Sequence, residues 1–291
     1  MFHGAMTAMV TPFSDGQVDE RRLREHVAFQ LDAGIAALVP CGTTGESPTL
    51  THEEHDRVIE IVVDAVGGRA PVIAGAGSNS TAEALRLTRH AKEVGASATL
   101  QVNPYYNKPT QEGLYRHFAT IADEVDLPVV LYNIPGRCGV AMTPATIARL
   151  AGHENIVAIK EATGSLDVAS EIAASCDIAI ISGDDSLTLP LMSVGGRGAI
   201  SVLSNILPGK VVAMVKAGLD GDFAEARRRH LELFTLAKGM LSLATNPIPV
   251  KTAMKLLGRD TGELRLPLCE MDGQTRDKLH ALLLAEDLLR S

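Results

Sequence analysis

The 291-residue chain is 46% hydrophobic, enough apolar sequence for one barrel-sized domain or two ordinary ones. Its formal net charge of −8, without a Lys/Arg cluster beside stacking aromatics, argues against a nucleic-acid partner. No apolar stretch approaches a membrane span, and Met1 to Thr11 lacks the basic and apolar segments of a signal peptide. The four cysteines are scattered and form no C-x-x-C pair, which is typical of reduced thiols. We therefore expect a cytoplasmic protein without membrane or nucleic-acid partners.

Short β-rich runs alternate with amphipathic segments over the first three-quarters of the chain. Thr51-x-x-Glu54 and Ser80-x-x-Glu83 predict capping boxes at helix starts, and Thr143-Pro144 predicts an N-cap followed by proline. Eight strands, each followed by a helical pattern, favour a (β/α)₈ TIM barrel over an open doubly wound sheet. The predicted strands are Ala5–Val10, Ala36–Val39, Val72–Ala74, Ala98–Val102, Pro128–Tyr132, Ile156–Lys160, Ile178–Ser182 and Gly198–Val202.

The last part of the chain has helical patterns only. They cover Asp222–Leu243, Pro247–Leu257 and Gln274–Leu289, with no strand between them. We therefore predict an α/β protein in which residues 1–222 form the barrel and residues 223–291 a small C-terminal helical appendage.

Lys160 stands at the end of a predicted buried strand. Strand side chains alternate between two sides, so Lys160 shares a side with Ala158 and the neighbouring acid Glu161 points the other way. A buried lysine without a close partner loses proton affinity and becomes a nucleophile toward carbonyls. Taken alone, however, a lysine at a strand end usually reaches water.

Three other strand ends carry unusual chemistry, and barrel active sites lie at these ends. Gly42-Thr43-Thr44-Gly45-Glu46 places two hydroxyls between glycines, where backbone N–H groups can hold a carboxylate, although it also suits an ordinary turn. Tyr105 and Tyr106 follow the fourth strand. Tyr132 ends the fifth strand, so its phenol is expected in the same barrel mouth as Lys160, and Arg137 follows with a fork suited to carboxylates.

Two motifs suggest sites that their context does not support. Gly75-Ala76-Gly77 follows a strand but lacks the third glycine of a dinucleotide fingerprint. His52-Glu53-Glu54-His55 spaces its histidines by three rather than the four of a zinc-protease helix, with no evident third ligand. We predict no metal and no cofactor. Cys41 and Cys138 lie beside the candidate loops without an evident base, so we interpret them as packing residues.

The ordered motifs together resemble the pyruvate-dependent class I aldolase and lyase family over essentially the whole chain. The resemblance rests first on the Gly42–Glu46 turn, on Tyr132-Asn133-Ile134-Pro135-Gly136-Arg137 and on Lys160-Glu161-Ala162-Thr163-Gly164. Further matches are Ser182-Gly183-Asp184-Asp185, Gly198-Ala199-Ile200-Ser201-Val202 and Asn246-Pro247-Ile248-Pro249-Val250-Lys251.

The resemblance implies a role for each matching residue. Lys160 would form an imine with pyruvate, Tyr132 would donate and accept protons, and Thr43 and Tyr106 would complete the relay, Tyr106 in the neighbouring subunit's site. Thr44 and Ile200 would contact pyruvate, and Gly183 would belong to the substrate-binding residues. Arg137 would receive the carboxylate of the second substrate, L-aspartate 4-semialdehyde. The family assembles as a dimer of dimers, so a homotetramer is expected.

A second site follows from the same resemblance. Family members inhibited by L-lysine bind it at a dimer interface, so we expect this chain to be inhibited by lysine as well. The residues of this chain that match the lysine site are Ser47, Pro48, His52, His55, Asn79, Glu83 and Tyr105.

The chain departs from the family pattern at two positions. Cys138 stands where Thr or Ser is frequent, and Pro48 stands where Ala also occurs. Neither departure removes a catalytic group.

Three functions stay open at this point. The first is the condensation of pyruvate with aspartate semialdehyde, the second a related lyase acting on a sugar acid or hydroxy-keto acid through the same imine, and the third a non-catalytic barrel that binds a small acid. The presence of the lysine, the phenols and the threonine pair together disfavours the third. Arg137 favours the first over the second.

Overall fold

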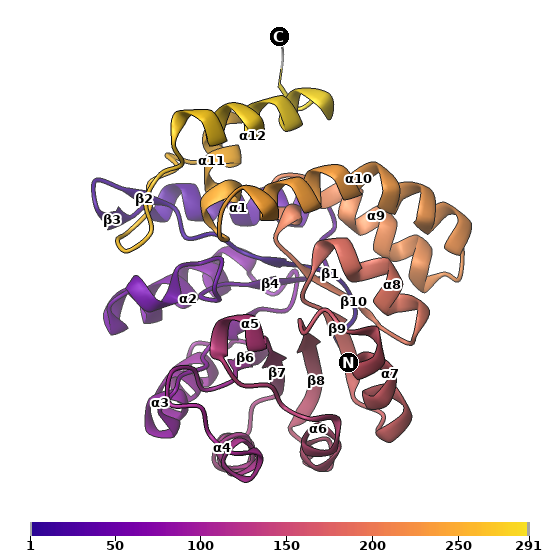
Figure 1. The fold of residues 1–291 in the computed structure, drawn as a ribbon. Helices are drawn as coiled ribbons and strands as arrows, with labels where there is room; N and C mark the ends of the chain where they lie inside the picture. The colour runs from indigo at the N-terminus through magenta and orange to yellow at the C-terminus, as the bar shows by residue number, and fades with distance from the viewer. Residues whose placement is uncertain (1, 290–291) are drawn as a thin grey trace.

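Eight parallel strands form a barrel in the computed structural model, which describes residues 2–289 (Figure 1). The strand order is β4-β1-β10-β9-β8-β7-β6-β5, and a parallel bridge between Leu38 and Val72 joins its two ends. All eight predicted strands are confirmed, with ends that shift by one or two residues. The barrel strands are β1 (Gly4–Ala8), β4 (Ala37–Val39), β5 (Ile73–Gly75), β6 (Ala98–Val102), β7 (Val129–Asn133), β8 (Ile156–Glu161), β9 (Ala179–Ser182) and β10 (Gly198–Ser201).

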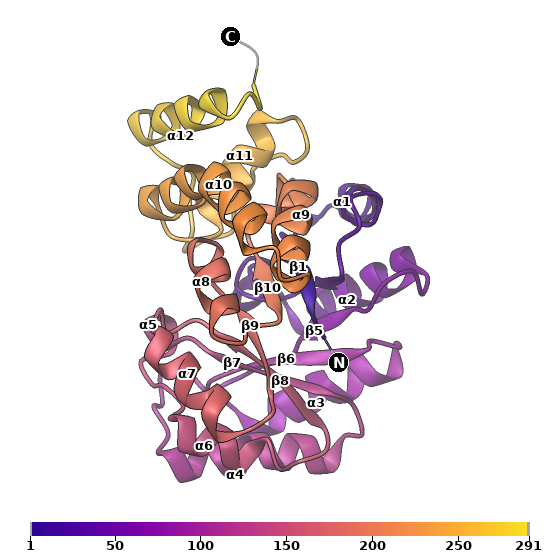
Figure 2. The same ribbon diagram turned by 90° about the vertical axis from the view of Figure 1, so that its right-hand side faces the viewer.

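A helix follows each strand and covers the outside of the barrel (Figures 1 and 2). Two of the predicted helix starts are confirmed. The Thr51 side chain and Glu54 cap each other's backbone N–H groups at the start of α2, and Thr143 caps α6 with Pro144 in its first turn. These helices are α1 (Glu20–Asp32), α2 (His52–Val66), α3 (Thr81–Glu93), α4 (Gln111–Glu124), α6 (Pro144–Leu150), α7 (Leu166–Ser175), α8 (Thr188–Ser193) and α9 (Pro208–Leu219).

The capping box predicted at Ser80 is wrong. The Ser80 side chain makes no capping hydrogen bond at the start of α3. Glu83 instead accepts hydrogen bonds from Ser78 Oγ through Oε2 and pairs with His52 Nε2 through Oε1, 2.8 Å away. The Ser80 N–H instead donates to Ser78 Oγ at 3.0 Å, so the reciprocal bond that a capping box requires is not formed.

Two layers of apolar side chains hold the barrel together. Inward-facing residues such as Met6, Val39, Leu100, Ala158 and Ile181 fill its interior. The outward-facing side chains of the same strands pack beneath the helices in a larger cluster, as expected when a parallel sheet is buried on both faces. Lys160 belongs to the inward-facing set, because its strand neighbour on that side is Ala158.

The C-terminal helices are α10 (Phe223–Leu243), α11 (Ile248–Leu256) and α12 (Gly273–Ala285), and Figures 1 and 2 show them grouped on one side of the barrel. The helix predicted to reach Leu289 ends at Ala285, and Asp287 beyond it takes a left-handed φ of 55°. The predicted division of the chain into residues 1–222 and 223–291 stays a prediction. The last two residues of the second part, 290–291, lie outside the residues that the structure describes. Within residues 2–289, no helix combines the length and apolarity needed to cross a membrane.

A small hairpin and several short turns were not predicted. Strands β2 (Phe13–Ser14) and β3 (Gln17–Val18) pair in antiparallel fashion around Asp15 and Gly16, both at positive φ. An Asp-Gly pair is a strong signal for such a turn, so this hairpin was visible in the sequence. The short helix α5 (Pro135–Cys138) and the 3₁₀ turns η1 (Ser47–Thr49), η2 (Asp185–Leu187) and η3 (Leu203–Asn205) follow strand ends at the barrel mouth.

Candidate active site

A cavity opens at the carboxyl ends of the barrel strands. Seven of the eight barrel strands, or the segments that directly follow them, contribute residues to its wall, together with Leu241 and Asn246 from the C-terminal region. This position is where barrel enzymes carry their active sites. The lining residues are Ala8, Val39, Gly42, Thr43, Thr44, Leu100, Tyr132, Ile134, Arg137, Lys160, Ala162, Gly183, Asp184, Asp185, Val202, Leu241 and Asn246.

The amine of Lys160 lies over the phenol ring of Tyr132. The two residues are direct partners in the register of β7 and β8, and Lys160 Nζ is 4.2 Å from the centroid of the Tyr132 ring. Both side chains are 5% exposed. The prediction that neighbouring strands direct an amine and a phenol into one mouth is therefore confirmed.

Burial makes the Lys160 amine reactive. Desolvation lowers its pKa from 10.5 to about 8, which the nearby Asp185 carboxylate opposes and Arg137 reinforces. With this pKa, about a tenth of the amine is neutral at pH 7, compared with roughly one part in three thousand for an ordinary lysine. Glu161 takes no part, because its carboxylate faces away and accepts from Asn133 Nδ2 at 3.1 Å and from the Thr163 N–H at 2.6 Å.

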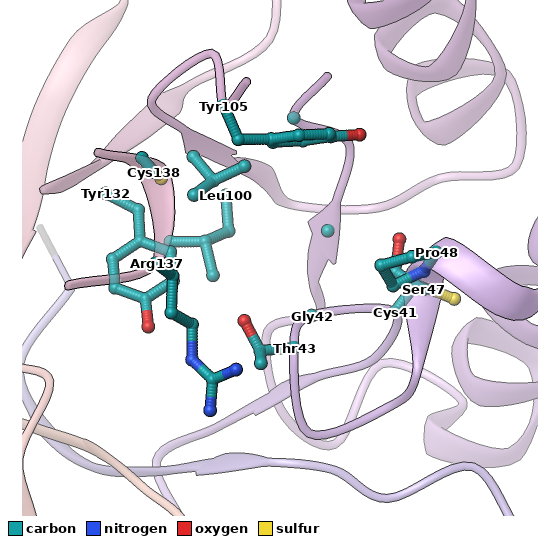
Figure 3. A pocket seen from close by; sticks show the side chains of 13 residues that line it. Cys41, Gly42, Thr43, Ser47, Pro48, Leu100, Tyr105, Tyr132, Arg137 and Cys138 are labelled. Atoms are coloured by element: carbon teal, nitrogen blue, oxygen red, sulfur yellow. The ribbon is translucent and has the colours of Figure 1, made fainter. Parts of the chain in front are cut away.

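Tyr132 is held in its protonated form. Desolvation raises the pKa of the phenol to about 12, while Arg137 and a hydrogen bond with the Thr43 side chain oppose this rise. A neutral phenol hydrogen-bonded to a threonine hydroxyl can both donate and accept protons. The structure thus brings Lys160, Tyr132 and Thr43 together, and Figure 3 shows the Tyr132 and Thr43 hydroxyls on the same side of the cavity.

The turn after β4 presents Thr43 and Thr44 to the cavity. It closes through backbone bonds from the Gly45 N–H to the Gly42 carbonyl and from the Glu46 N–H to the Thr43 carbonyl, both 3.1 Å. The side chain of Thr44 is fixed from the C-terminal region, since Asn246 Nδ2 donates to its Oγ1 over 2.9 Å.

Arg137 stands at the rim of the cavity on the short helix α5. It is exposed, and one Nη donates to the Asn246 carbonyl at 3.1 Å, while Figure 3 shows its guanidinium extending toward Thr43. Its remaining N–H groups leave the fork available for an incoming carboxylate.

The structure places the three remaining predicted site residues differently from those above: Gly183, Ile200 and Tyr106. A Cβ at Gly183 would lie 3.1 Å from Lys160 Cε and 2.7 Å from the Ala162 Cβ, so this glycine gives the lysine its space. Ile200 is buried in the barrel interior, and Val202 lines the cavity instead. Tyr106 is 91% exposed, with a φ of 71°, and is not among the residues that line either cavity at the mouth of its own chain. The predicted contacts of Ile200 and Tyr106 stay predictions.

The residues of the predicted inhibitor site also lie close together. Glu83 is hydrogen-bonded to both Ser78 and His52, and these two bonds, that from Ser78 foremost, lower the pKa of Glu83. Ser78 is in turn hydrogen-bonded to the Tyr105 phenol. Asn79 accepts from Asn107 through its carbonyl at 2.8 Å. His55 differs from the rest because it is buried at 4% exposure, where desolvation lowers its pKa to about 4.

A second cavity connects this cluster with the catalytic mouth. Its wall includes Ser47, Pro48 and Tyr105 at one end and Thr43, Tyr132 and Arg137 at the other (Figure 3). Cys41 and Cys138 are buried in the same wall, and burial raises the pKa of both thiols, that of Cys138 to about 11. Thiols with such pKa values are poor nucleophiles, as the packing interpretation requires.

The glycine pair Gly75 and Gly77 and the histidine His52, which suggested a dinucleotide site and a metal site in the sequence, have structural roles. A Cβ at Gly75 would lie 2.1 Å from the Cys41 carbonyl oxygen, and one at Gly77 would lie 2.3 Å from the Val102 nitrogen, so these glycines allow neighbouring backbones to approach. His52 pairs with Glu83, and the described residues contain no cluster of three His, Cys, Asp or Glu suited to a metal ion.

Sequence reasoning missed two residues of the mouth. Asp185 acts on Lys160 electrostatically and accepts the Val202 and Leu203 N–H groups, each at 2.9 Å. Asn246 holds Thr44 and Arg137. Both residues belong to motifs that carry the family resemblance. Their contacts were missed because the pattern within one segment does not show which other segment it meets in the folded chain.

An amine with a pKa near 8, beside a protonated phenol in the mouth of a (β/α)₈ barrel, defines a class of protein: barrel enzymes whose lysine reacts with carbonyl compounds. Residues 1–286 match the model of the dihydrodipicolinate synthetase family. The chain therefore belongs to this family, and the resemblance found in the sequence is confirmed.

Named relatives and solved structures match over nearly their full length. The 4-hydroxy-tetrahydrodipicolinate synthase of Geotalea daltonii is 55% identical over 285 residues, covering 97% of this chain and 98% of the relative. The chloride-inhibited dihydrodipicolinate synthase from Acinetobacter baumannii, complexed with pyruvate, has a TM-score of 0.96 at 41% identity and covers 99% of this chain and 100% of its own. The synthase from Cyanidioschyzon merolae with lysine bound has a TM-score of 0.96 at 43% identity and covers 99% of both chains.

Proposed function

We propose that the chain condenses pyruvate with L-aspartate 4-semialdehyde to form 4-hydroxy-tetrahydrodipicolinate. The observation that carries the proposal is the placement of the Lys160 amine, with its lowered pKa, over Tyr132 in the barrel mouth. The names of the curated relatives support the choice of reaction. The product would enter diaminopimelate and lysine biosynthesis, and the expected location is the cytoplasm.

Lys160 would begin the reaction by adding to the carbonyl carbon of pyruvate. Tyr132, hydrogen-bonded to Thr43, donates the proton with which the carbinolamine oxygen leaves as water, and an imine remains. The cationic imine nitrogen withdraws electrons, so the methyl group of pyruvate loses a proton and an enamine forms. The enamine carbon then attacks the aldehyde, and the amine of the semialdehyde closes the ring by adding to the imine carbon and expelling Lys160.

Two carboxylates need places in this scheme. Thr44, fixed by Asn246, and the backbone N–H groups of its turn are suited to the pyruvate carboxylate. Arg137 at the rim is suited to the carboxylate of the semialdehyde, since a guanidinium can bind it with two parallel hydrogen bonds. Arg137 therefore favours this reaction over a related lyase acting on sugar acids or hydroxy-keto acids.

The test of the proposal is the trapping of the imine with borohydride in the presence of pyruvate. We expect Lys160 to gain the mass of pyruvate less one water and plus two hydrogens, because its neutral amine adds to the carbonyl, water leaves and borohydride reduces the imine. The sign of the pH dependence follows from its pKa of about 8: trapping accelerates nearly tenfold per pH unit below 8 and levels off above it. Supplying the semialdehyde or sugar aldehydes afterwards selects the second substrate. Labelling at another lysine would contradict the proposal.

We further propose that L-lysine inhibits the enzyme at the cluster around Glu83. The carboxylate of Glu83 pairs with the ammonium of the ligand, and Tyr105 and Asn79 hold its amino-acid end. The expected result is a fall in the condensation rate as lysine rises to millimolar concentrations. The Glu83→Gln variant is expected to shift the curve to higher lysine with an unchanged rate in its absence, since Glu83 touches no reacting group. A flat wild-type curve would contradict the site.

Tyr106 leads to a proposal about assembly, a homotetramer built as a dimer of dimers. Because its side chain is exposed and lines neither cavity of its own chain, we propose that it completes the relay in the partner's site. Mixing refolded Lys160→Ala and Tyr106→Phe chains then gives hybrid dimers with one intact site, and we expect about a quarter of wild-type activity from inactive parents. If Tyr106 served its own chain, the hybrids would contain no intact site and activity would stay at the parental level.

A further inference from the structure

A salt bridge without contact with solvent joins the C-terminal region to the turn after β4. Lys251 Nζ on α11 donates to Glu46 Oε1 at 2.7 Å and to the Thr11 carbonyl at 2.9 Å, and it lies 4.2 Å from the centroid of the Phe13 ring. Both charged side chains are 0% exposed. The mechanism described above uses neither of them.

A buried ion pair is an expensive way to stabilise a fold, because both charges lose their hydration. A pair of apolar side chains of similar size would usually serve stability as well or better. The retention of such a pair next to a catalytic turn therefore calls for another explanation, and the conformation of Glu46 provides one.

Glu46 takes a left-handed φ of 54°, an uncommon conformation for a residue other than glycine. It ends the turn that contains Thr43 and Thr44, and its N–H closes that turn on the Thr43 carbonyl. Its second carboxylate oxygen accepts the Arg265 N–H at 3.1 Å. The side chain of Glu46 is thus held at both oxygens by residues from the C-terminal region.

The same region also reaches the turn at Thr44, through Asn246. Asn246 lies two residues before α11 begins at Ile248, and Lys251 lies within the helix, five positions after Asn246. Helix α11 and the residue pair leading into it therefore fix the turn at two points, on either side of Gly45. The Gly45 carbonyl in turn accepts from Thr11 Oγ1 at 2.7 Å.

We propose that Lys251 is a positioning residue for the condensation: its ammonium holds Glu46 and so sets the turn that places the hydroxyls of Thr43 and Thr44 at the pyruvate. This inference rests on the proposed function. It assigns to α11 a part in substrate placement, through a residue that itself touches neither substrate nor the reacting lysine.

The test compares the rate of imine trapping with pyruvate in Lys251→Met and in a control of similar stability. Leu283→Ala removes a fully buried side chain of α12 that has no contact with the turn, so it reports the effect of destabilisation alone. We expect Lys251→Met to lower kcat/KM for pyruvate on the order of 10²-fold in the folded fraction, because small displacements of positioning groups have effects of this size. Leu283→Ala is expected to keep the wild-type KM.

A double variant keeps the test decisive if the unpaired Glu46 carboxylate prevents Lys251→Met from folding. Glu46→Gln/Lys251→Met removes both charges of the salt bridge, although the buried Asp260 carboxylate that also faces Lys251 remains. It is expected to be more stable than Lys251→Met while trapping pyruvate as slowly as that single variant. Wild-type trapping rates in either folded variant would overturn the positioning role. Absence of trapping in the wild-type enzyme would instead overturn the proposed function, which separates the two failures.

Discussion

Replacing Lys160 by alanine is expected to lower the condensation rate by at least about 10⁴-fold, because losing a covalent nucleophile removes the intermediate itself. The measurement is the steady-state rate, combined with mass analysis after borohydride reduction in pyruvate. The matched control is Lys255→Ala, which removes an exposed lysine from α11 and is expected to leave both results unchanged. Residual activity close to that of the wild type would show that another group forms the intermediate.

The loss of activity is expected to come without a loss of stability. The pKa of Lys160 is lower in the folded chain than in the unfolded chain, so the unfolded state binds more protons between pH 8 and 10.5. Stability therefore rises with pH through this window, and below it the buried charge costs about 3 kcal/mol. The Lys160→Met variant is accordingly expected to unfold at the same temperature as the wild type or a higher one at pH 7.

Replacing Tyr132 by phenylalanine is expected to lower the rate by about 10²–10⁴-fold, the usual contribution of a positioned proton donor and acceptor. The ring remains beneath the Lys160 amine, so the loss reflects the hydroxyl and its link to Thr43. Two measurements separate the steps: single-turnover trapping follows dehydration to the imine, and exchange of the pyruvate methyl protons in D₂O follows enamine formation.

The matched control for this variant is Tyr115→Phe. The Tyr115 hydroxyl contacts only His153 Nε2 among the described hydrogen bonds, at 3.2 Å on the outside of the barrel, so its loss is expected to leave the rate unchanged. If Tyr132→Phe formed the imine at the wild-type rate, a different group would have to dehydrate the carbinolamine, and the relay through Thr43 would be refuted.

The barrel was predictable because its strand pattern is local. A buried parallel strand reads as a short apolar run, and each run here is followed by an amphipathic segment, so eight repeats indicate the fold. The pairing of Lys160 with Tyr132 was predictable for a related reason. Both residues end adjacent strands on the inward side, and alternation along a strand determines that side.

Contacts between distant segments were not predictable in this way. Lys251 and Glu46 are 205 positions apart, and nothing in the pattern around either residue indicates a buried partner. The error at Ser80 is partly of this kind, since Glu83 pairs with His52, 31 positions away. The other bond to Glu83 comes from Ser78, which is near in sequence but outside the capping rule. Asp185 likewise acts on Lys160 only because β8 and β9 are neighbours in the barrel.

The absence of a side chain at Gly183 has a consequence for comparing members of the family. Any larger residue at this position would meet the stem of Lys160, which lies on β8, and at once the Cβ of Ala162, which directly follows that strand. A relative that retains the lysine but carries another residue in place of this glycine would have to direct its amine elsewhere. The glycine can thus serve, together with the lysine, as a practical marker for separating active homologues from chains that keep the barrel and have lost the chemistry.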